Sequence, residues 1–224
     1  MQFKIVHNRI GSDLWANTRL RIVNKIVKGE GNLILDLGCG KGYVGTELSK
    51  TGNNVIFAEI DPTLIKNVEG KKIILDAINM PFKKFTFDYV LCADVLEHIL
   101  DDKKVLSNIY DSLKHGGKAV IAVPAYKGLY GHHDSLIGHY RRYDYKDLCK
   151  LAKQVGFKVK YARYACSLLF FPFIVNQMIV KSNKAYQGNS GLERKFLPLL
   201  NLLAIIESSI RMPFGIGLMM VLEK

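Results

Sequence analysis

The sequence predicts an α/β fold, in which a sheet of mainly parallel strands carries helices on both faces. From Asn32 to Tyr164, short apolar stretches of strand length alternate with longer segments of helical pattern. This alternation is typical of a parallel sheet joined by helices. The 224 residues are enough for one sizeable core but not for a second independent one. We therefore expect a single domain over residues 1–224 with its central part at residues 31–164.

An amphipathic helix is expected before the sheet, from Ser12 to Lys28, within an N-terminal helical cap over residues 1–30. Ser12 is a typical N-cap residue, and apolar residues recur at helical spacing. These apolar residues are Leu14, Leu20, Ile22, Val23, Ile26 and Val27. The helix is expected to cross the ligand cleft, where Trp15 and Arg19 could contact substrate. Packing and a solvated charge are the simpler roles for these two side chains.

The first strand ends in an acid and a turn with three closely spaced glycines, in the run Leu33-Ile34-Leu35-Asp36-Leu37-Gly38-Cys39-Gly40-Lys41-Gly42. Glycine lets the backbone turn tightly and approach a ligand, and the helix that begins near Tyr43 directs its N-terminal amides to the same place. A dinucleotide fingerprint would need a glycine at position 43, and a Walker loop would need Ser or Thr after Lys41. The turn therefore does not predict a pyrophosphate site.

The second expected strand, residues 55–59, ends at Glu59. This acid follows the glycines by about twenty residues, where a carboxylate can accept hydrogen bonds from two ribose hydroxyls. Asp61 is the alternative ribose ligand. However, Asp61 and Pro62 suit the N-cap and first residue of a helix over residues 63–68 better.

A third expected strand, residues 73–77, carries Asp76 near its end. Any one such acid is by itself more simply explained as a solvated loop carboxylate or a helix cap. Acids at three successive strand ends, together with the glycine turn, instead predict a ligand site along this edge of the sheet.

The pattern Asp-x-Gly-x-Gly-x-Gly after a buried strand resembles motif I of the class I methyltransferases that use S-adenosylmethionine. The resemblance covers about two thirds of the chain and implies a Rossmann-like, seven-stranded sheet with an antiparallel last strand. It implies that Asp36 lies near the ammonium of the cofactor's amino-acid tail, Glu59 near the ribose and Asp76 near the adenine. The expected cofactor-binding residues are Asp36, Gly38, Cys39, Gly40, Gly42, Glu59, Ile60, Asp76, Ala77 and Cys92.

The fourth expected strand, residues 87–92, is followed by Ala93-Asp94-Val95-Leu96-Glu97-His98. This segment resembles the Val-Leu-Glu-His segment of small-molecule methyltransferases. Further along, Gly116 and Gly117 are expected to close a helix. They lead into a fifth strand over residues 119–123.

Residues 124–144 follow the fifth strand and are rich in glycine, tyrosine, histidine and arginine. Ligands of open α/β sheets lie beyond the carboxyl ends of the strands, so this segment is expected to border the reaction site as a mobile lid. Arg142 is the lid cation expected to contact an anionic or hydroxyl-bearing acceptor. The alternative is a loop whose tyrosines pack and whose arginines face water.

Methyl transfer from a sulfonium is a direct displacement, so the protein mainly has to align the reactants and exclude water. A hydroxyl acceptor also needs a base, and imidazole suits this role because it titrates near neutral pH. His98 and His139 are the candidates, and with Arg142 they form the expected catalytic set. Each histidine could instead be a structural one bonded to the backbone.

Asp94, Glu97, His98 and His139 also resemble the ligand set of metal-dependent O-methyltransferases of quinone synthesis and small-RNA 2′-O-methylation. A divalent ion there would lower the pKa of a hydroxyl and orient it. Asp94 stands where those families usually have Glu, and many of their members carry the Glu-His pair without metal. A divalent metal is therefore the less favoured expectation, and no metal ligand is assigned.

Residues 165–212 contain two strongly apolar stretches, 167–175 and 197–206, both interrupted by proline and shorter than the about 20 residues that span a bilayer. They are expected to form a helical insertion before the last strand, residues 213–224, which should run antiparallel beside the fifth. The insertion would pack on the sheet or on a second subunit of a homodimer. The alternative is an acceptor channel with a basic rim on anionic lipid headgroups.

The formal net charge of +12 predicts attraction to an anionic partner, which could be a nucleic acid, a membrane face or a phosphorylated acceptor. Four cysteines without paired metal-ligand spacing predict reduced thiols and a cytoplasmic protein. Residues 1–7 contain no apolar run with a cleavage site, so secretion is not expected.

The leading hypothesis is an S-adenosylmethionine-dependent methyltransferase that acts on oxygen of a small, glycan or lipid-linked acceptor, with peripheral contact at the cytoplasmic membrane face. An RNA methyltransferase would explain the charge, but no appended nucleic-acid module is evident. A non-catalytic protein that binds the cofactor is the other alternative, because fold does not fix function.

Overall fold

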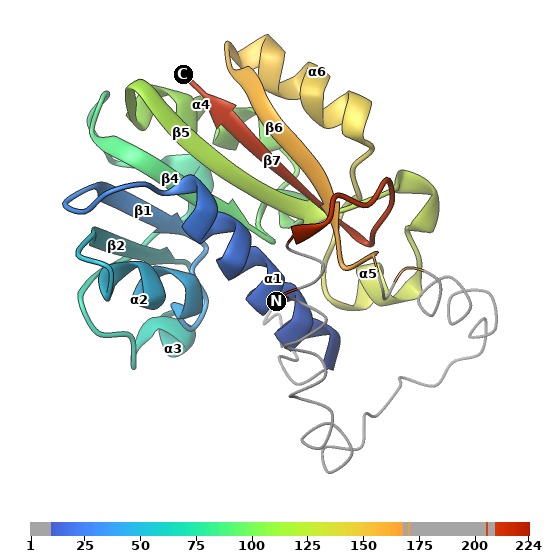
Figure 1. Cartoon of the computed structure of the whole chain (residues 1–224), viewed down its shortest axis with the longest axis horizontal. Helices are drawn as coiled ribbons and strands as arrows, with labels where there is room; N and C mark the ends of the chain where they lie inside the picture. The colour runs from blue at the N-terminus through green and yellow to red at the C-terminus, as the bar shows by residue number, and fades with distance from the viewer. Residues whose placement is uncertain (1–9, 168–169, 171–204, 206–208) are drawn as a thin grey trace.

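A computed structural model describes residues 10–167, 170, 205 and 209–224. The chain forms a seven-stranded sheet between two groups of helices (Figure 1). The strands are β1 (Leu33–Leu37), β2 (Asn54–Glu59), β3 (Lys71–Ile74), β4 (Phe87–Ala93), β5 (Leu113–Pro124), β6 (Lys158–Ala165) and β7 (Gly217–Glu223). The helices are α1 (Ile10–Ile26), α2 (Tyr43–Ser49), α3 (Pro62–Ile65), α4 (Asp102–Ser112), α5 (His132–Leu136) and α6 (Tyr145–Val155), with 3-10 turns η1 (Ala77–Asn79), η2 (Leu96–His98) and η3 (Lys127–Leu129).

The strand order across the sheet is β3-β2-β1-β4-β5-β7-β6. The pairs among β1 to β5 are parallel, whereas β7 runs antiparallel to both β5 and β6. The predicted seven-stranded sheet with an antiparallel last strand is therefore confirmed. The chain reverses its direction across the sheet between β1 and β4, and ligands of such sheets bind beyond the strand ends at this point.

Each face of the sheet is covered by its own apolar core. On one face, α1, α2 and α3 contribute side chains such as Ile22, Leu48 and Ile65. On the other face, α4 and α6 contribute side chains such as Leu106 and Leu148. Helices therefore lie on both faces, as the sequence predicts, and β4 alternates its side chains between the two cores.

Several element boundaries differ from the sequence predictions. Helix α1 begins at Ile10, so Ser12 lies inside it and is not its N-cap. Helix α4 ends at Ser112, and Gly116 and Gly117 lie in an irregular stretch of β5 instead of closing the helix. The pairing of β4 with β5 shifts register there, and Gly116 supplies a positive φ of 75°. The prediction of a glycine-closed helix was wrong for this reason.

Two short elements near the glycine turn also differ. Strand β3 ends at Ile74, because Asp76 accepts a hydrogen bond from the backbone N–H of Ile78 and caps η1. Helix α3 stops at Ile65, earlier than expected, although Asp61 is its N-cap and Pro62 its first residue, as predicted.

The predicted apolar insertion, residues 165–212, lies largely outside the described residues. The last strand begins at Gly217 and not at residue 213, and it pairs beside β5 as predicted. Within the described ranges, no helix combines the length and the apolar character needed to cross a bilayer.

Gly45, in the first turn of α2, allows this helix to lie close to β1 and β2. A Cβ atom at this position would lie 2.5 Å from the Phe57 ring and 2.7 Å from Oδ2 of Asp36. The backbone N–H of Gly45 donates a hydrogen bond to the same Asp36 oxygen over 3.1 Å. The absence of a side chain therefore fixes the position of α2 under the end of β1.

We expect Gly45→Ala to lower the free energy of unfolding by about 1–3 kcal/mol, because the added methyl group crowds a closely packed site. Urea denaturation measures this change. Gly128→Ala is the matched control, since a Cβ there meets nothing within 4 Å and should change stability by less than about 0.5 kcal/mol. Equal effects of the two substitutions would contradict the packing argument.

Candidate active site

The glycine turn after β1 is shaped by positive backbone angles and by the end of β4. Gly38, Gly40 and Gly42 have φ values of 69°, 55° and 72°, a region that residues with a Cβ rarely adopt. A Cβ on Gly38 would also collide with the Val95 side chain. The sequence therefore requires glycine here for both conformation and space.

Glu59 connects the end of β2 to the glycine turn by a hydrogen bond. Its Oε2 accepts a hydrogen bond from the Gly40 N–H over 2.8 Å, and its Oε1 accepts bonds from the N–H groups of Ile60 and Asp61 over 2.9 and 3.1 Å. Oε2 accepts one bond and has a lone pair left for another, so ribose binding by Glu59 is compatible with this geometry and remains a prediction. The structural role of Glu59 in holding the turn was not predicted.

Asp36 is buried at the end of β1 and faces a small cavity. Burial raises the pKa of this carboxyl to about 6, against the opposing effects of nearby Arg19 and of the Gly45 N–H. The cavity has a volume of about 40 Å³. Its lining residues are Arg19, Val23, Asp36, Gly38, Cys39, Tyr43, Val44, Leu91, Ala93, Val120 and Ala122. An ammonium group bound here would offset the cost of the buried charge.

Other expected cofactor residues lie outside the lining of this small cavity. Asp76 is exposed where it caps η1, next to the buried Ala77, and Ile60 is 64% exposed. Cys92 is fully buried in the core under α4 and α6. Since its neighbours Leu91 and Ala93 line the cavity, the Cys92 thiol points away from it. Only the backbone of Cys92 can serve the predicted role.

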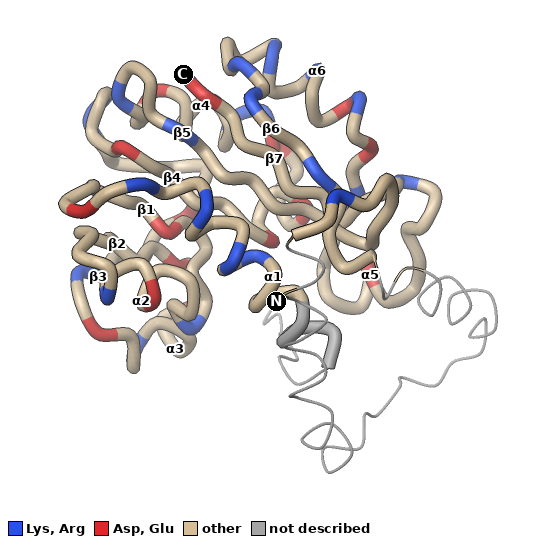
Figure 2. Tube along the Cα trace, viewed as in Figure 1, with Lys and Arg blue, Asp and Glu red and all other residues tan. Residues whose placement is uncertain are grey.

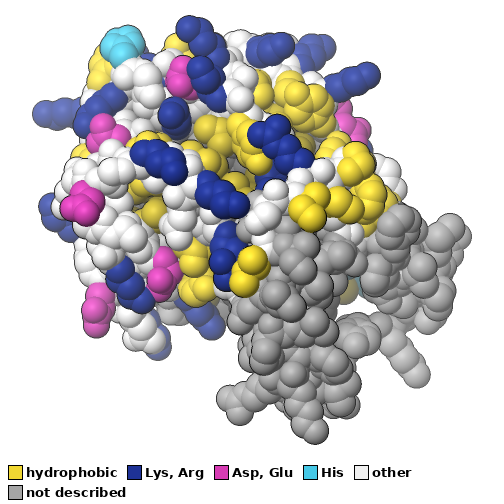
Figure 3. Space-filling view, viewed as in Figure 1, with side chains coloured by type: hydrophobic (Ala, Val, Ile, Leu, Met, Phe, Trp, Pro, Cys, Tyr) yellow, Lys and Arg dark blue, Asp and Glu magenta, His cyan; other side chains and the backbone are white. Residues whose placement is uncertain are grey.

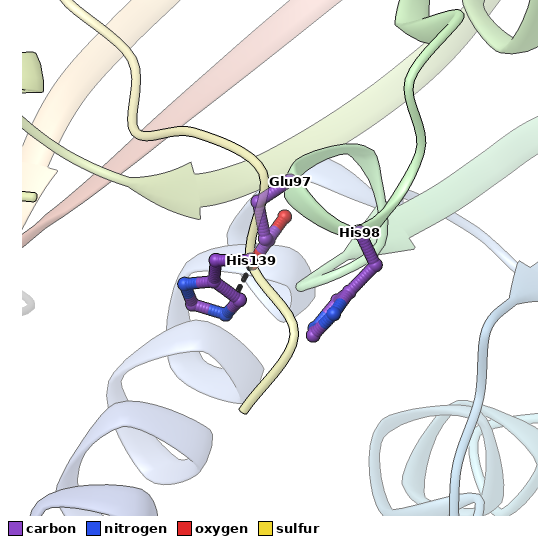
Figure 4. Close-up of side chains that lie close together, drawn as sticks. All are labelled: Glu97, His98 and His139. Atoms are coloured by element: carbon purple, nitrogen blue, oxygen red, sulfur yellow. Dashed lines mark ion pairs between the residues drawn. The ribbon is translucent and has the colours of Figure 1, made fainter. Parts of the chain in front are cut away.

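Glu97, His98 and His139 come together at the end of β4 (Figure 4). Glu97 and His98 belong to η2, and His139 follows α5. Nε2 of His139 lies 3.8 Å from Oε1 of Glu97, and the centroids of the two imidazole rings are 4.6 Å apart. The structure thus brings the two predicted catalytic histidines together across 41 residues of chain.

Both histidines are held through Nδ1. Nδ1 of His98 lies 3.2 Å from the carbonyl oxygen of Gly138, and Nδ1 of His139 lies 2.9 Å from Oδ1 of Asp134. Both partners are oxygen atoms that can only accept a hydrogen bond, so Nδ1 carries the hydrogen. A neutral ring then keeps its lone pair on Nε2. Burial and the neighbouring His139 lower the pKa of His98 below its usual value. The neutral form of His98 is therefore favoured near pH 7.

Arg142 forms its bonds within the protein, and its contact with an acceptor stays a prediction. Its side chain is buried, and its Nε donates to both carboxylate oxygens of Asp134 over 2.9 Å. Burial alone would raise the pKa of Asp134, but the bonds from His139 and Arg142 outweigh it and hold this pKa below its usual value. Asp134 thus stays charged and orients His139. No local pattern in the sequence predicts this role of Asp134, because a loop acid usually faces water.

The segment predicted as a lid is anchored to the core. The Tyr143 hydroxyl donates to Asp102 over 2.8 Å, and the Tyr140 N–H donates to the Glu97 carbonyl over 2.7 Å. Arg141 pairs with the same Asp102 carboxylate at 3.0 Å. This segment therefore carries His139 on a fixed support beside the end of β4.

Asp94 faces α1 and is separate from the histidine cluster. The indole N–H of Trp15 donates to both Asp94 oxygens over 3.0 and 2.8 Å, and Arg19 pairs with Oδ2 at 2.5 Å. The four-residue metal set is therefore assembled only in part. Glu97, His98 and His139 each place a ligand atom within 4.8 Å of the others.

The chemistry of these three donors fits a divalent cation. The buried Oε2 of Glu97 has no hydrogen-bond partner among the described residues. Burial and the nearby Asp94 raise the pKa of Glu97 well above its usual value. Ligating histidines commonly donate their second N–H to a carbonyl or carboxylate, as His98 and His139 do.

Residues 7–162 match a family model described as a methyltransferase domain, which is well over half of the 224-residue chain. The chain belongs to this family of S-adenosylmethionine-dependent class I methyltransferases. The resemblance of the glycine turn to motif I of the class I methyltransferases is thereby confirmed as a family relationship.

Curated relatives match the methyltransferase over part of their length. An uncharacterized protein of Methanocaldococcus jannaschii is 40% identical over 93 residues, which cover 41% of this chain and 40% of that protein. A ubiquinone biosynthesis O-methyltransferase of Coxiella burnetii is 27% identical over 109 residues, which cover 45% of this chain and 47% of that enzyme. The chain thus spans less than half of the length of these relatives.

Solved structures share the fold of the methyltransferase over most of its length. A Haloferax volcanii methyltransferase, solved in complex with the activator Trm112, superposes with a TM-score of 0.66 at 18% identity and covers 96% of this chain and 91% of its own. Phosphoethanolamine N-methyltransferase 2 of Haemonchus contortus, bound to S-adenosyl-L-methionine, gives 0.65 at 17% identity and covers 100% of this chain and 60% of its own. At these identities the likeness shows the fold alone.

We expect Asp36→Asn to raise the free energy of unfolding at pH 7.5 by about 1–3 kcal/mol, because it removes a buried charge whose pKa is raised to about 6. A raised carboxyl pKa means that the cost of the charge builds up between the unfolded value of 3.8 and the folded value of about 6, and is complete above pH 6. The gain should therefore shrink as the pH falls from 6 to 4 and vanish at lower pH, where this carboxyl is protonated in both the folded and the unfolded state. Urea denaturation between pH 4 and 8 measures it.

Asp111→Asn is the control for this experiment. The Asp111 side chain is 50% exposed and pairs with Lys84 at 3.6 Å, and such surface pairs contribute little. Its substitution should change stability by less than about 0.5 kcal/mol at every pH. A loss of stability in Asp36→Asn at high pH would refute the argument from burial.

Proposed function

We propose that the chain is an S-adenosylmethionine-dependent methyltransferase that acts on a hydroxyl oxygen of a small, glycan or lipid-linked acceptor. The observation that carries the proposal is the pair of partly buried histidines beside the end of β4, each bonded through Nδ1, so that each neutral ring keeps a lone pair on Nε2. A base is needed for a hydroxyl acceptor, and this pair supplies one next to the predicted cofactor cleft.

The reaction transfers one methyl group and one proton. The acceptor hydroxyl gives its proton to an imidazole Nε2, and its oxygen attacks the methyl carbon as the bond from carbon to sulfur breaks. The sulfonium becomes the neutral thioether of S-adenosylhomocysteine. Asp134 stabilises the resulting positive charge on His139 because it lies 2.9 Å from Nδ1. His98 lies close enough to contribute to the same proton acceptance.

The distribution of charge supports an anionic acceptor. Lys and Arg residues recur on α1, α6 and β6 (Figure 2), and their side chains spread over one face of the molecule with apolar side chains between them (Figure 3). This face would attract a phosphorylated small molecule or a lipid-linked acceptor at a membrane surface. The Haemonchus neighbour has also been solved with phosphomonomethylethanolamine and S-adenosylhomocysteine, which is an anionic small molecule beside the product of the cofactor.

A divalent ion held by Glu97, His98 and His139 is the alternative use of the same groups. When bound, such an ion would lower the pKa of the acceptor hydroxyl. His98 and His139 would then bind through Nε2 and could not accept the proton. The unpartnered Oε2 of Glu97 is the observation that favours this alternative.

We expect His139→Ala to lower kcat by about 100-fold or more, because general bases contribute about 10²- to 10⁴-fold, and to leave the cofactor Kd within twofold. The wild-type rate should fall as pH decreases through the lowered pKa of His98, below its usual 6.5, since a protonated imidazole cannot accept a proton. Steady-state assays from pH 5 to 8 and calorimetric titration with S-adenosylhomocysteine measure these effects.

His115→Ala is the control, because His115 is exposed and stacks on Phe85 away from the cluster. Unchanged kcat in His139→Ala would remove this residue from the reaction. Treatment with EDTA separates the two uses of the cluster. Activity that survives EDTA supports the base, whereas loss that Mg²⁺ or Mn²⁺ reverses supports the ion.

The acceptor class is tested by incubating the protein and methyl-labelled S-adenosylmethionine with extracts of the source organism. We expect label in the lipid, glycan or small-molecule fraction, and a bond stable to mild acid and base would agree with an ether product. Label in RNA would favour an RNA methyltransferase instead. Cofactor binding without any transfer would favour a non-catalytic binding protein.

A further inference from the structure

Exposed apolar side chains gather in the two segments that carry the histidine cluster, residues 97–102 and 127–144. Four of the eleven large apolar side chains that are exposed among the described residues lie there. They are Leu100 (66% exposed), Tyr130 (42%), Leu136 (60%) and Tyr140 (52%), and we call them the apolar rim. Single exposed apolar side chains need no explanation, but their concentration around one site marks a surface that binds a ligand or a partner.

Both tyrosines of the apolar rim are bonded to the histidine cluster. The Tyr130 hydroxyl donates to the carbonyl oxygen of His139 over 2.8 Å, and the Tyr140 N–H donates to the carbonyl oxygen of Glu97 over 2.7 Å. Tyr140 also follows His139 directly in the chain. A ligand that contacts these rings therefore lies next to the imidazole that is proposed to accept the proton.

Both leucines of the apolar rim are held by the same network. Leu136 ends α5, two residues before Gly138, whose carbonyl oxygen lies 3.2 Å from Nδ1 of His98. Leu100 follows His98 by two residues, and its carbonyl oxygen accepts a bond from Nη2 of Arg141 over 2.9 Å. These backbone contacts hold the two leucines in place while their side chains remain exposed to water.

The Lys and Arg side chains of these two segments all form ion pairs within the protein. The segments contain three such residues, and each pairs with an aspartate. The pairs are Lys127 with Asp147 at 2.6 Å, Arg141 with Asp102 at 3.0 Å and Arg142 with Asp134 at 2.9 Å. An uncharged apolar group therefore complements the apolar rim better than an anionic group, which the Lys and Arg residues of α1, α6 and β6 would attract (Figure 2).

We propose that the apolar rim binds a hydrocarbon chain of the acceptor, so that the methylated hydroxyl belongs to an amphiphile whose chain begins close to the reacting oxygen. This inference rests on the proposed function, because it places the acceptor hydroxyl at Nε2 of His139. It narrows the proposed acceptors to lipid-linked ones. The rim binds by removing apolar surface from water, an effect proportional to the area buried. Its four side chains take no part in the transfer of the proton.

Alkyl β-D-glucosides test the inference, because they join sugar hydroxyls to a chain of chosen length and carry no charge. The full chain, with S-adenosylhomocysteine bound, is titrated calorimetrically with hexyl, octyl and decyl glucosides below their micelle concentrations. The titrations give the gain in affinity for each added methylene. Full burial of one methylene corresponds to about fourfold, so a chain on a partly open rim should gain about two- to threefold per methylene.

The double variant Leu100→Ser with Leu136→Ser should reduce this gain to less than about 1.5-fold per methylene and should bind S-adenosylhomocysteine like the wild type. Both side chains are exposed, so the variant is expected to fold. Phe85→Ser is the matched control, because Phe85 is also exposed (47%) and precedes β4, at the opposite end of this strand from the histidines. It should keep the chain-length response of the wild type.

Affinity that does not change with chain length in the wild type would overturn the inference. A chain-length response that the double variant keeps would also overturn it, since the chain would then bind elsewhere. Dissociation of a wild-type dimer in the double variant, measured by light scattering with the chain-length response unchanged, would assign the rim to a subunit interface instead. In each case, transfer of labelled methyl groups to extracts would leave the proposed function intact. If the wild type neither bound S-adenosylhomocysteine nor transferred label, the proposed function itself would fail.

Discussion

The parallel pairing of β1 with β4 is the constraint on which the rest of the site depends. It aligns Asp36 with Leu91 and Leu37 with Cys92, so the two strands end at the same edge of the sheet. The glycine turn and η2 both begin at this edge, and Gly38 must lack a side chain because Val95 lies against it. The groups predicted to bind the cofactor and those predicted to accept the proton are therefore neighbours as a consequence of strand order.

Three buried carboxylates near this edge differ in how far hydrogen bonds and nearby cations compensate the cost of burial. Asp134 has a guanidinium and an imidazole as direct partners and keeps its charge. Asp36 accepts one bond from the backbone N–H of Gly45, has Arg19 nearby, and has a raised pKa. Glu97 has an oxygen without a partner among the described residues and a pKa raised well above its usual value by burial and by Asp94. Incomplete compensation of this kind is typical of sites that bind or transform a ligand.

Helix α1 joins parts of the molecule that are distant in sequence. Trp15 bonds Asp94 at the end of β4 and packs so closely on β7 that a Cβ at Gly217 would collide with its ring. A second contact, from the Tyr43 hydroxyl to Oδ1 of Asn17, connects α1 to the start of α2 over 2.7 Å. The N-terminal helix therefore belongs to the site as well as covering the sheet.

The sequence by itself determined the alternation of strands and helices, the glycine turn and the two candidate histidines, because these depend on local periodicity and on short motifs. The antiparallel last strand was predicted from the resemblance to class I methyltransferases. Asp134, the burial of Arg142 and the position of Asp94 were decided only by the tertiary structure. In a loop sequence, an acid and an arginine eight positions apart look like solvated charges. Their burial follows from how residues 124–144 pack against the end of β4, and contacts of that kind leave no local pattern in the chain.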